Sequence, residues 1–385
     1  MYMVFLWSMK ILFTGGGTGG HIVPILAIAR ELRKIYEGAD LGLFYIGPKD
    51  DFNELLFAQE GIHMFEILAG KVRRYGGFQT IFQNMFDIFF KTPIGIIQAF
   101  LKVFFLAPDV ILSKGGYGAI PAVVASWLLH VPVFLHESDS VPGLANRIAA
   151  TFSLKIFVSF PHTQKFPIQK TILTGNPIRK EILTGSKQEA ARLFHLAGDR
   201  PLVFILGGSQ GAQKINDLVL LLLNDTLNDF EIIHQTGEKN FEQVRAEAKT
   251  VADPSKETYY HPTPFLKETE LRHAYAACNF IVNRAGSGSI FEIAALGKPS
   301  ILIPLAGAAQ NHQVENAYAY AKNGAAIILE EANLTPHFFL EKLKSLFANP
   351  QELANMSRSA LAFAKPEAAH FIAQYLIEYL KHDPE

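Results

Sequence analysis

A glycine-rich turn that ends in a histidine could hold an anion beside a titratable group. The turn runs from Gly15 to Gly20, and His21 follows at once. An apolar run at residues 11–13 precedes it, and a helical pattern begins near Pro24. Glycines let a backbone turn sharply and approach a ligand, and the N–H groups at a helix start favour negative charge. The spacing therefore predicts an anion-binding turn, with His21 where chemistry could occur.

The same glycines match the Gly-x-Gly-x-x-Gly spacing of a dinucleotide-binding turn. Dehydrogenases with that turn place an Asp or Glu at the end of the second strand to hold the ribose. Here the second predicted strand is followed by Gly47 and Pro48, and Asp50 and Asp51 come only later. The pattern therefore argues against a nicotinamide cofactor.

Polar residues also follow other predicted strands, where doubly wound folds bind ligands. Four such segments cover residues 113–121, 136–147, 175–179 and 283–292, and a further polar run covers 310–317. The second half repeats the first in one respect, since a glycine-rich turn at 207–212 follows the apolar run 203–206. Both halves of the chain therefore offer ligand-binding turns.

The elements that must position these residues alternate along the chain. Short apolar runs separated by helical patterns predict parallel sheets with helices on both faces. Gly and Pro interrupt the alternation at residues 175–177, so the sequence predicts two doubly wound α/β domains, 1–177 and 178–365. We also expect a C-terminal helix at 366–385 that packs back on the first domain. Strands are predicted at residues 10–14, 41–46, 64–67, 110–113, 132–136, 155–158, 171–174, 202–206, 230–235, 259–261, 280–283, 300–303 and 325–328.

Charge and cysteine content limit the classes of function. The net charge of −1 gives no strong field for nucleic acid. Through Pro177 the chain has 15 Lys and Arg against 12 Asp and Glu, and after Pro177 it has 20 against 24. The first half is therefore slightly positive, which suits contact with an anionic surface. The one cysteine, Cys278, excludes an internal disulfide and fits a reducing compartment. Its apolar neighbours predict a core thiol and no metal site.

A phenylalanine-rich stretch from Phe78 to Leu106 is the most apolar part of the chain. Lys91, Pro93 and Lys102 interrupt it, so we do not expect about 20 clean apolar residues for a spanning helix. Three basic residues stand just before it: Lys71, Arg73 and Arg74. Apolar surface flanked by basic residues indicates an interfacial membrane patch, and the alternative is a helix buried under a domain.

Taken together and in this order, the segments resemble the MurG family of peptidoglycan glycosyltransferases, over nearly the whole chain from Gly15 to Ala317. The resemblance implies the GT-B fold, in which two Rossmann-like domains face a cleft. It implies an inverting transfer of N-acetylglucosamine from UDP-GlcNAc to lipid I, undecaprenyl-diphosphate-MurNAc-pentapeptide, which forms lipid II. Such an enzyme is peripheral to the cytoplasmic face of the cell membrane and uses no cofactor.

The resemblance assigns substrate contacts to both domains. They are Thr18, Gly19, Gly20, Asp139, Arg179, Ser209, Leu266, Ser287, Gly288, Ser289, Ile290, Phe291, Glu292 and Gln313. Within this set, Glu292 is expected on the ribose hydroxyls, the backbone of Leu266 on uracil and Gln313 on the donor sugar. Arg179 and the helix start at Ser287 are expected to hold the diphosphate without a metal, and the chain has no Asp-x-Asp triplet.

One position departs from the family's pattern. The family usually reads His-Glu-Gln-Asn where this chain has His136-Glu137-Ser138-Asp139. A carboxylate at Asp139 accepts hydrogen bonds but donates none unless it is protonated. The sugar contact of the family's asparagine is therefore in question, and Asp139 becomes the second candidate for general base after His21.

Other functions fit parts of the pattern. A hydrolysing 2-epimerase shares the fold and acts on UDP-GlcNAc alone, but needs no apolar patch. A non-catalytic, membrane-associated sugar-nucleotide sensor would keep the binding residues without turnover. Structural roles are also open, with His21 closing its helix turn, Arg179 in a linker salt bridge and Asp139 as a helix cap.

Overall fold

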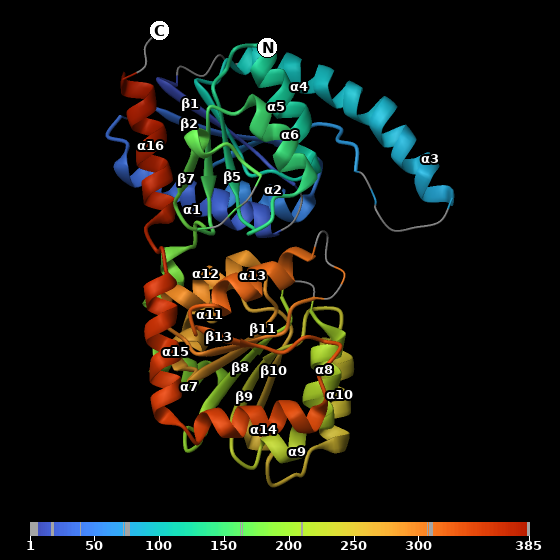
Figure 1. Ribbon diagram of the computed structural model, residues 1–385, viewed down its shortest axis with the longest axis vertical. Coiled ribbons are helices and arrows are strands. Elements are labelled where there is room, and N and C mark those ends of the chain that lie inside the picture. Colours follow the sequence, from blue (N-terminus) through green and yellow to red (C-terminus); the bar gives the residue numbers. More distant parts are fainter. Residues whose placement is uncertain are drawn as a thin grey trace. The chain divides into compact units, whose positions relative to one another are not determined.

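The computed structural model describes residues 7–16, 19–38, 40–71, 73, 78–161, 163, 165–208, 211–305, 307 and 311–382 (Figure 1). The chain divides into two compact units. Unit 1 consists of Met1–Arg179 and Glu367–Glu385, and unit 2 of Lys180–Pro366. The division falls two residues after the expected boundary at Pro177, and the C-terminal segment belongs to unit 1.

Unit 1 is built on a parallel sheet of seven strands in the order β3-β2-β1-β4-β5-β6-β7. Alternate residues of β1, an interior strand, face opposite helical layers, as the two-residue period of a strand requires. Ile11 and Phe13 lie in the core beneath α1 (Gly19–Ile35) and α16 (Ala368–His382), whereas Leu12 lies in the core beneath α4 (Thr92–Leu106) and α5 (Ile120–Leu128). The strands are β1 Met9–Thr14, β2 Leu41–Gly47, β3 His63–Glu66, β4 Val110–Ser113, β5 Val133–Glu137, β6 Lys155–Val158 and β7 Thr171–Leu173.

Two helices of unit 1 differ from expectation at a proline. The first begins at Gly19 and carries Pro24 inside it, so His21 stands in its first turn. The apolar stretch is helical from Phe78 to Leu106, with a π-helical turn, Asp87–Lys91, before Pro93. Lys91, Pro93 and Lys102 were expected to leave no stretch suited to a spanning helix, but by length and composition Thr80–Leu106 passes that test. The helices are α1 Gly19–Ile35, α2 Asp51–Gln59, α3 Phe78–Phe86, α4 Thr92–Leu106, α5 Ile120–Leu128, α6 Leu144–Phe152 and α16 Ala368–His382.

Unit 2 repeats the plan with six parallel strands in the order β10-β9-β8-β11-β12-β13. The strands are β8 Leu202–Leu206, β9 Glu231–Gln235, β10 Tyr260–Thr263, β11 Phe280–Asn283, β12 Ser300–Leu302 and β13 Ala326–Ile328. The helices are α7 Lys187–Phe194, α8 Gln213–Leu221, α9 Leu223–Thr226, α10 Phe241–Val251, α11 Glu268–Ala277, α12 Ser287–Ala295, α13 His312–Ala321, α14 Pro336–Phe347 and α15 Pro350–Phe363. The prediction of two doubly wound α/β units is confirmed.

Each sheet changes the direction of winding between its two central strands. The change lies between β1 and β4 in unit 1, and between β8 and β11 in unit 2. Doubly wound folds bind ligands outside the carboxyl ends of the strands at such a point. The glycine-rich turns after β1 and β8 stand at these two points, which makes them the places to look for a site.

Candidate functional site

His21 is held between two glycine-rich turns of unit 1. A Cβ atom added to Gly16, after β1, would lie 3.2 Å from Nδ1 and Cε1 of the imidazole. A Cβ atom added to Gly116, after β4, would lie 3.2 Å from Nε2. The φ of Gly116 is 80°, a region that L-residues with side chains rarely adopt. Glycine at these positions therefore lets backbone from two strand ends close on the ring.

A buried polar network connects this place to Asp139. Asn146 accepts a hydrogen bond from the Gly116 N–H through Oδ1 at 3.3 Å and donates one to Glu137 Oε2 at 2.7 Å. The other oxygen, Glu137 Oε1, accepts the N–H of Asp139 at 2.9 Å. Burial raises the pKa of Glu137, and the charge of Asp139 adds to the effect. The first helix turn, the turn after β4 and the turn after β5 are thus fixed as one assembly.

Lys114 lies at the end of β4 with only 1% of its surface exposed. Its ammonium group donates to Ser138 Oγ, and that hydroxyl donates to Asn176 Oδ1 at 2.9 Å. Burial lowers the pKa of Lys114, whereas the nearby charges of Glu137 and Asp139 raise it. The ammonium charge is therefore held at the switch point among Ser138, Glu137 and Asp139.

His136 and Asn176 carry buried polar atoms that lack a partner within the described part of the chain. His136 Nε2 lies 3.2 Å from the Gly175 carbonyl oxygen, whereas Nδ1 has no partner among the described residues. The same holds for Nδ2 of Asn176. Burial lowers the pKa of His136, so the ring is neutral, with Nε2–H donating to Gly175. A buried polar group left without a partner costs about 1–3 kcal/mol, so a ligand hydroxyl or water that reached these atoms would be stabilised.

In unit 2 the turn after β11 leads into α12. Gly286 precedes the helix, and the N–H groups of Ser287, Gly288 and Ser289 belong to the first turn, which has no earlier helical carbonyl to bond. The Ile290 N–H already donates to the Gly286 carbonyl at 3.0 Å. The first three residues therefore have N–H groups at a helix start, a place where an anion is favoured.

The side chains of Ile290 and Phe291, in the first turns of α12, pack into the core of unit 2. Both side chains are buried, with 0% and 1% exposed, and the ring of Phe291 packs on Phe363 with centroids 5.2 Å apart. Glu292, one residue further, accepts a hydrogen bond from Tyr275 OH at 3.2 Å. The side chains of Ile290 and Phe291 therefore position the turn rather than present themselves to a ligand.

The remaining predicted residues follow other strands of the two sheets. Leu266 follows β10, and its N–H donates to Gln235 Oε1 at 3.1 Å. Gln313 lies in the first turn of α13, and its Oε1 accepts the Leu305 N–H at 3.0 Å. Arg179 is the last residue of unit 1 before the chain enters unit 2. Thr18 and Ser209 lie outside the described residues.

The structure adds Lys114 and Asn176 to the set. Sequence analysis included both in polar segments but gave neither a role. A lysine directly after the strand β4, which begins with three apolar residues, was the available signal, since lysine is almost never fully buried without a partner. In the described part of the chain, no group of three or more His, Cys, Asp or Glu is placed to hold a metal ion.

Comparison with known proteins identifies a family for both units of the chain. The glycosyltransferase family 28 N-terminal domain matches residues 11–158, and the C-terminal domain of the same family matches residues 202–372. A UDP-N-acetylglucosamine–N-acetylmuramyl-(pentapeptide) pyrophosphoryl-undecaprenol N-acetylglucosamine transferase of Clostridium tetani is 38% identical over 355 residues, 91% of this chain and 94% of that relative.

Solved structures agree on the fold. The crystal structure of Acinetobacter baumannii MurG covers 96% of this chain and 99% of its own, with a TM-score of 0.73 at 24% identity. A UDP-GlcNAc 2-epimerase from Neisseria meningitidis, bound to UDP-GlcNAc, covers 96% and 100%, with a TM-score of 0.66 at 16% identity. The two domain matches and the near full-length relative confirm the resemblance seen in the motifs: the chain belongs to glycosyltransferase family 28 and, within it, to the MurG family.

Proposed function

We propose that this protein is an inverting glycosyltransferase that moves N-acetylglucosamine from UDP-GlcNAc to lipid I and forms lipid II in peptidoglycan synthesis. The observation that carries the proposal is the near full-length match to transferases named for this reaction. The sites at the two switch points agree with it. Unit 2 offers an uncharged helix start for a diphosphate, and unit 1 offers titratable side chains beside His21.

In the proposed reaction the hydroxyl of the acceptor sugar attacks the anomeric carbon of the donor. The bond from that carbon to the UDP oxygen breaks as the new glycosidic bond forms, so the configuration inverts. The hydroxyl proton passes to a general base, and the negative charge stays on UDP. The N–H groups at Ser287–Ser289 and the guanidinium of Arg179 would stabilise that charge.

His21 is our first choice for the base and Asp139 our second. The two glycine turns fix the imidazole without enclosing it in side chains, since His21 is half-buried. A base held in one orientation accepts a proton with little rearrangement, which is worth about 10²–10⁴ in rate. Asp139 is attached to the same assembly through Glu137.

Apart from Arg179, the donor contacts named in this proposal lie in unit 2. Glu292 would accept hydrogen bonds from the ribose hydroxyls, Leu266 would offer backbone to uracil, and Gln313 would reach the sugar. Each residue follows a different strand of the sheet, β11, β10 and β12 respectively, at the carboxyl ends where such folds bind ligands.

We further propose that the helix from α3 to α4 seats the protein on the cytoplasmic face of an anionic membrane. Many of its apolar side chains are exposed, including Phe82, Phe86, Phe89 and Phe105 with 59%, 53%, 66% and 81% of their surface. The alternative of a buried helix therefore does not hold for α3. By length and composition, Thr80–Leu106 is one helix that could cross a membrane. However, α4 packs on α5 through Gly95, Ala99 and Val103, so we favour an interfacial position.

Transfer of radiolabelled sugar from UDP-GlcNAc to lipid I tests the reaction. We expect a labelled lipid product and one UDP released per transfer. Release of UDP and free sugar without an acceptor would identify an epimerase instead. Binding of UDP-GlcNAc with no turnover on a lipid acceptor would identify a sensor.

Changing Phe82, Phe86 and Phe89 together to Ser tests the membrane patch. We expect weaker sedimentation with anionic vesicles and an unchanged melting temperature, because these side chains are exposed. A large loss of melting temperature would show that they belong to the core.

A further inference from the structure

A short stretch of extended chain lies along the apolar helix of unit 1. We call this stretch, residues 68–71 and 73, the strap. At one end the Leu68 N–H donates to Gln98 Oε1 of α4 at 2.8 Å. Next along the helix, a Cβ atom on Gly95 would collide with the Leu68 carbonyl oxygen. Backbone and helix are therefore in direct contact along α4, without intervening side chains.

The strap next meets the π-helical turn. The N–H of Thr92 donates to the Asp87 carbonyl, a bond that spans five residues, and Thr92 Oγ1 donates to the same oxygen at 2.9 Å. Pro93 has no N–H to continue the regular ladder, so the wider turn before it is physically reasonable. A Cβ atom on Gly70 would collide with both the Asp87 carbonyl and the Thr92 hydroxyl.

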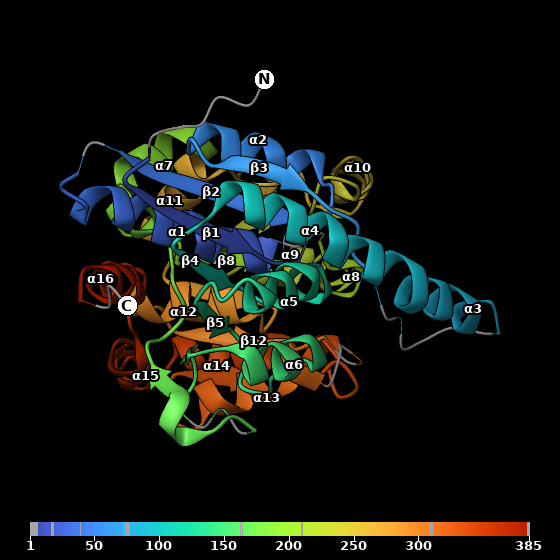
Figure 2. The ribbon, with the colours of Figure 1, turned by 90° about the horizontal axis from the view of Figure 1, so that it is seen from above.

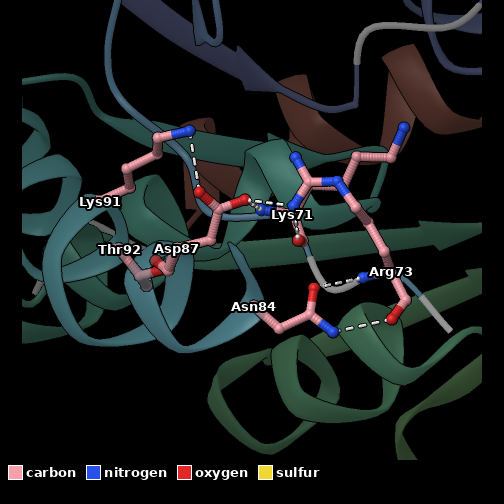
Figure 3. Close-up of polar contacts among 6 residues, drawn as sticks. All are labelled: Lys71, Arg73, Asn84, Asp87, Lys91 and Thr92. Atoms are coloured by element: carbon pink, nitrogen blue, oxygen red, sulfur yellow. Dashed lines mark hydrogen bonds and ion pairs between the residues drawn. The ribbon is translucent and has the colours of Figure 1, made fainter. Parts of the chain in front are cut away.

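The carboxylate of Asp87 also bonds the strap to the π-helical turn, as Figure 3 shows. Its side chain is 3% exposed. Oδ2 accepts from the Arg73 guanidinium at 2.8 Å and from the Lys71 N–H at 3.2 Å, and Oδ1 pairs with the Lys91 ammonium at 2.8 Å. Burial raises the pKa of Asp87, but the hydrogen bonds from these partners outweigh it and hold the pKa below its ordinary value.

Asn84, one turn earlier, fastens the far end of the strap. Its Oδ1 accepts the Arg73 N–H at 2.9 Å, and its Nδ2 donates to the Arg73 carbonyl at 2.7 Å (Figure 3). The strap is thus bonded to the helix on both sides of the π-helical turn, at Gln98 and at Asn84. Figure 2 shows α3 extending beyond the sheet of unit 1.

The strap also reaches the candidate site. Lys71 Nζ lies 5.8 Å from the ring centroid of Tyr117. Tyr117 follows directly on Gly116, the residue that closes on His21. One continuous set of contacts therefore runs from the exposed phenylalanines to the switch point of unit 1.

We propose that Asp87 is a positioning residue for a membrane-embedded acceptor: by binding the strap to the helix, it fixes the direction of α3 relative to the switch point of unit 1. The same bonds hold Arg73 and Lys91, whose side chains are 36% and 39% exposed, beside the apolar surface, where lipid phosphates lie. The inference rests on the proposed function, because it needs a lipid-borne acceptor. The inference concerns the orientation of α3 and not the affinity of the protein for the membrane, since the exposure of the phenylalanines does not depend on the Asp87 carboxylate.

The test compares two acceptors with the full-length protein. One is lipid I in phosphatidylglycerol–phosphatidylcholine vesicles, and the other is a short-chain, water-soluble analogue without vesicles. Asp87→Asn removes the charge that pairs the two cations, and Asn84→Ala removes the second attachment without changing charge. Glu54→Gln removes an exposed carboxylate from α2 of the same unit and serves as the matched control.

With the vesicle acceptor we expect kcat/KM of both strap variants to fall about 10-fold, because orientation is lost. With the soluble acceptor, and in the KM for UDP-GlcNAc, we expect no more than about a 2-fold change, because the reacting groups are untouched. Vesicle sedimentation of Asp87→Asn should be kept or strengthened, since Arg73 and Lys91 lose their counter-charge. Backbone amide exchange in residues 78–91 should speed up while that of β1 and β4 does not.

Three results would overturn the inference. An equal loss of kcat/KM on both acceptors would give Asp87 a general structural role. Unchanged turnover on vesicles would show that the strap does not position the helix, and a loss of vesicle binding matching the loss of turnover would make Asp87 an affinity residue. No transfer by the wild-type protein to either acceptor would instead refute the proposed function.

Discussion

The two units share a plan of winding but differ in the chemistry at their switch points. In unit 1, buried ionisable side chains gather there: Lys114, Glu137 and His136 are all fully or nearly fully buried. In unit 2 the corresponding place is a helix start with Ser287 and Ser289 and backbone N–H groups. Fixed dipoles suit a diphosphate that keeps its charge, whereas titratable groups suit a step that moves a proton. We therefore propose that the backbone N–H groups of unit 2 hold the leaving group, together with Arg179 of unit 1, and that a side chain of unit 1 accepts the proton.

Replacing His21 is the strongest test of this assignment of roles to the two units. We expect His21→Ala to lower kcat about 10²–10⁴-fold with little change in the KM for UDP-GlcNAc, because only the proton transfer is lost. Steady-state kinetics at saturating acceptor measure this effect. His337→Ala, on the exposed start of α14, is the control. Near-normal turnover of His21→Ala would remove His21 as the base.

Replacing Glu292 tests the other side of the comparison. We expect Glu292→Ala to raise the Kd for UDP about 30-fold, in keeping with the loss of hydrogen bonds to a charged group. Calorimetry with UDP measures the effect, and Glu268→Ala, in the first turn of α11, provides a control carboxylate. Unchanged UDP affinity would mean that Glu292 only supports α12 through Tyr275.

The buried carboxylate of Glu137 gives a pH-dependent prediction. Burial raises its pKa from 4.5 to about 7, so between these values the folded protein holds a proton that the unfolded chain has lost. Rising pH therefore lowers stability over this interval. Glu137→Gln does not titrate, so urea unfolding from pH 4.5 to 7 should show a flatter profile. An unchanged profile would place the shifted proton on another group.

Asp139→Asn is expected to have the smallest effect. If His21 is the base, restoring the family's asparagine should change kcat by no more than about 3-fold and should improve the acceptor KM, since an amide donates as well as accepts. Initial rates over a range of lipid I concentrations measure both constants. A large fall in kcat would make Asp139 the base and reverse our order of preference.

Much of the fold could be predicted because apolar runs bounded by Gly and Pro mark buried parallel strands. Each predicted strand is present, and β4, β6, β8 and β11 have the predicted bounds. The errors lie at prolines. Pro24 was interpreted as a helix start although α1 begins at Gly19. Pro93 was expected, with Lys91 and Lys102, to interrupt the apolar stretch, although a π-helical turn precedes it and the helix continues to Leu106.

The candidate site was predictable only where backbone conformation demands a residue type. Glycines at 16 and 116 are visible in a sequence, but the closing of both on His21 requires the pairing of β1 with β4. The burial of Lys114 and its contact with Ser138 depend on neighbouring strands in the same way. The strap could not be predicted, because its contacts with Asn84 and Asp87 follow no regular period.

The return of α16 to unit 1 has a consequence for how the protein is made. Ile372 and Leu376 complete the core over β1, and His370 Nδ1 lies 3.1 Å from Glu31 Oε2 of α1. The ribosome synthesises the N-terminus first, so the sheet of unit 1 lacks the helix α16 on one face until the last residues are made. Unit 2 is continuous in sequence and can fold before α16 is synthesised. A fragment ending at Arg179 would expose this bare apolar face, and a separately expressed first half needs residues 367–382 supplied in trans or joined by a linker.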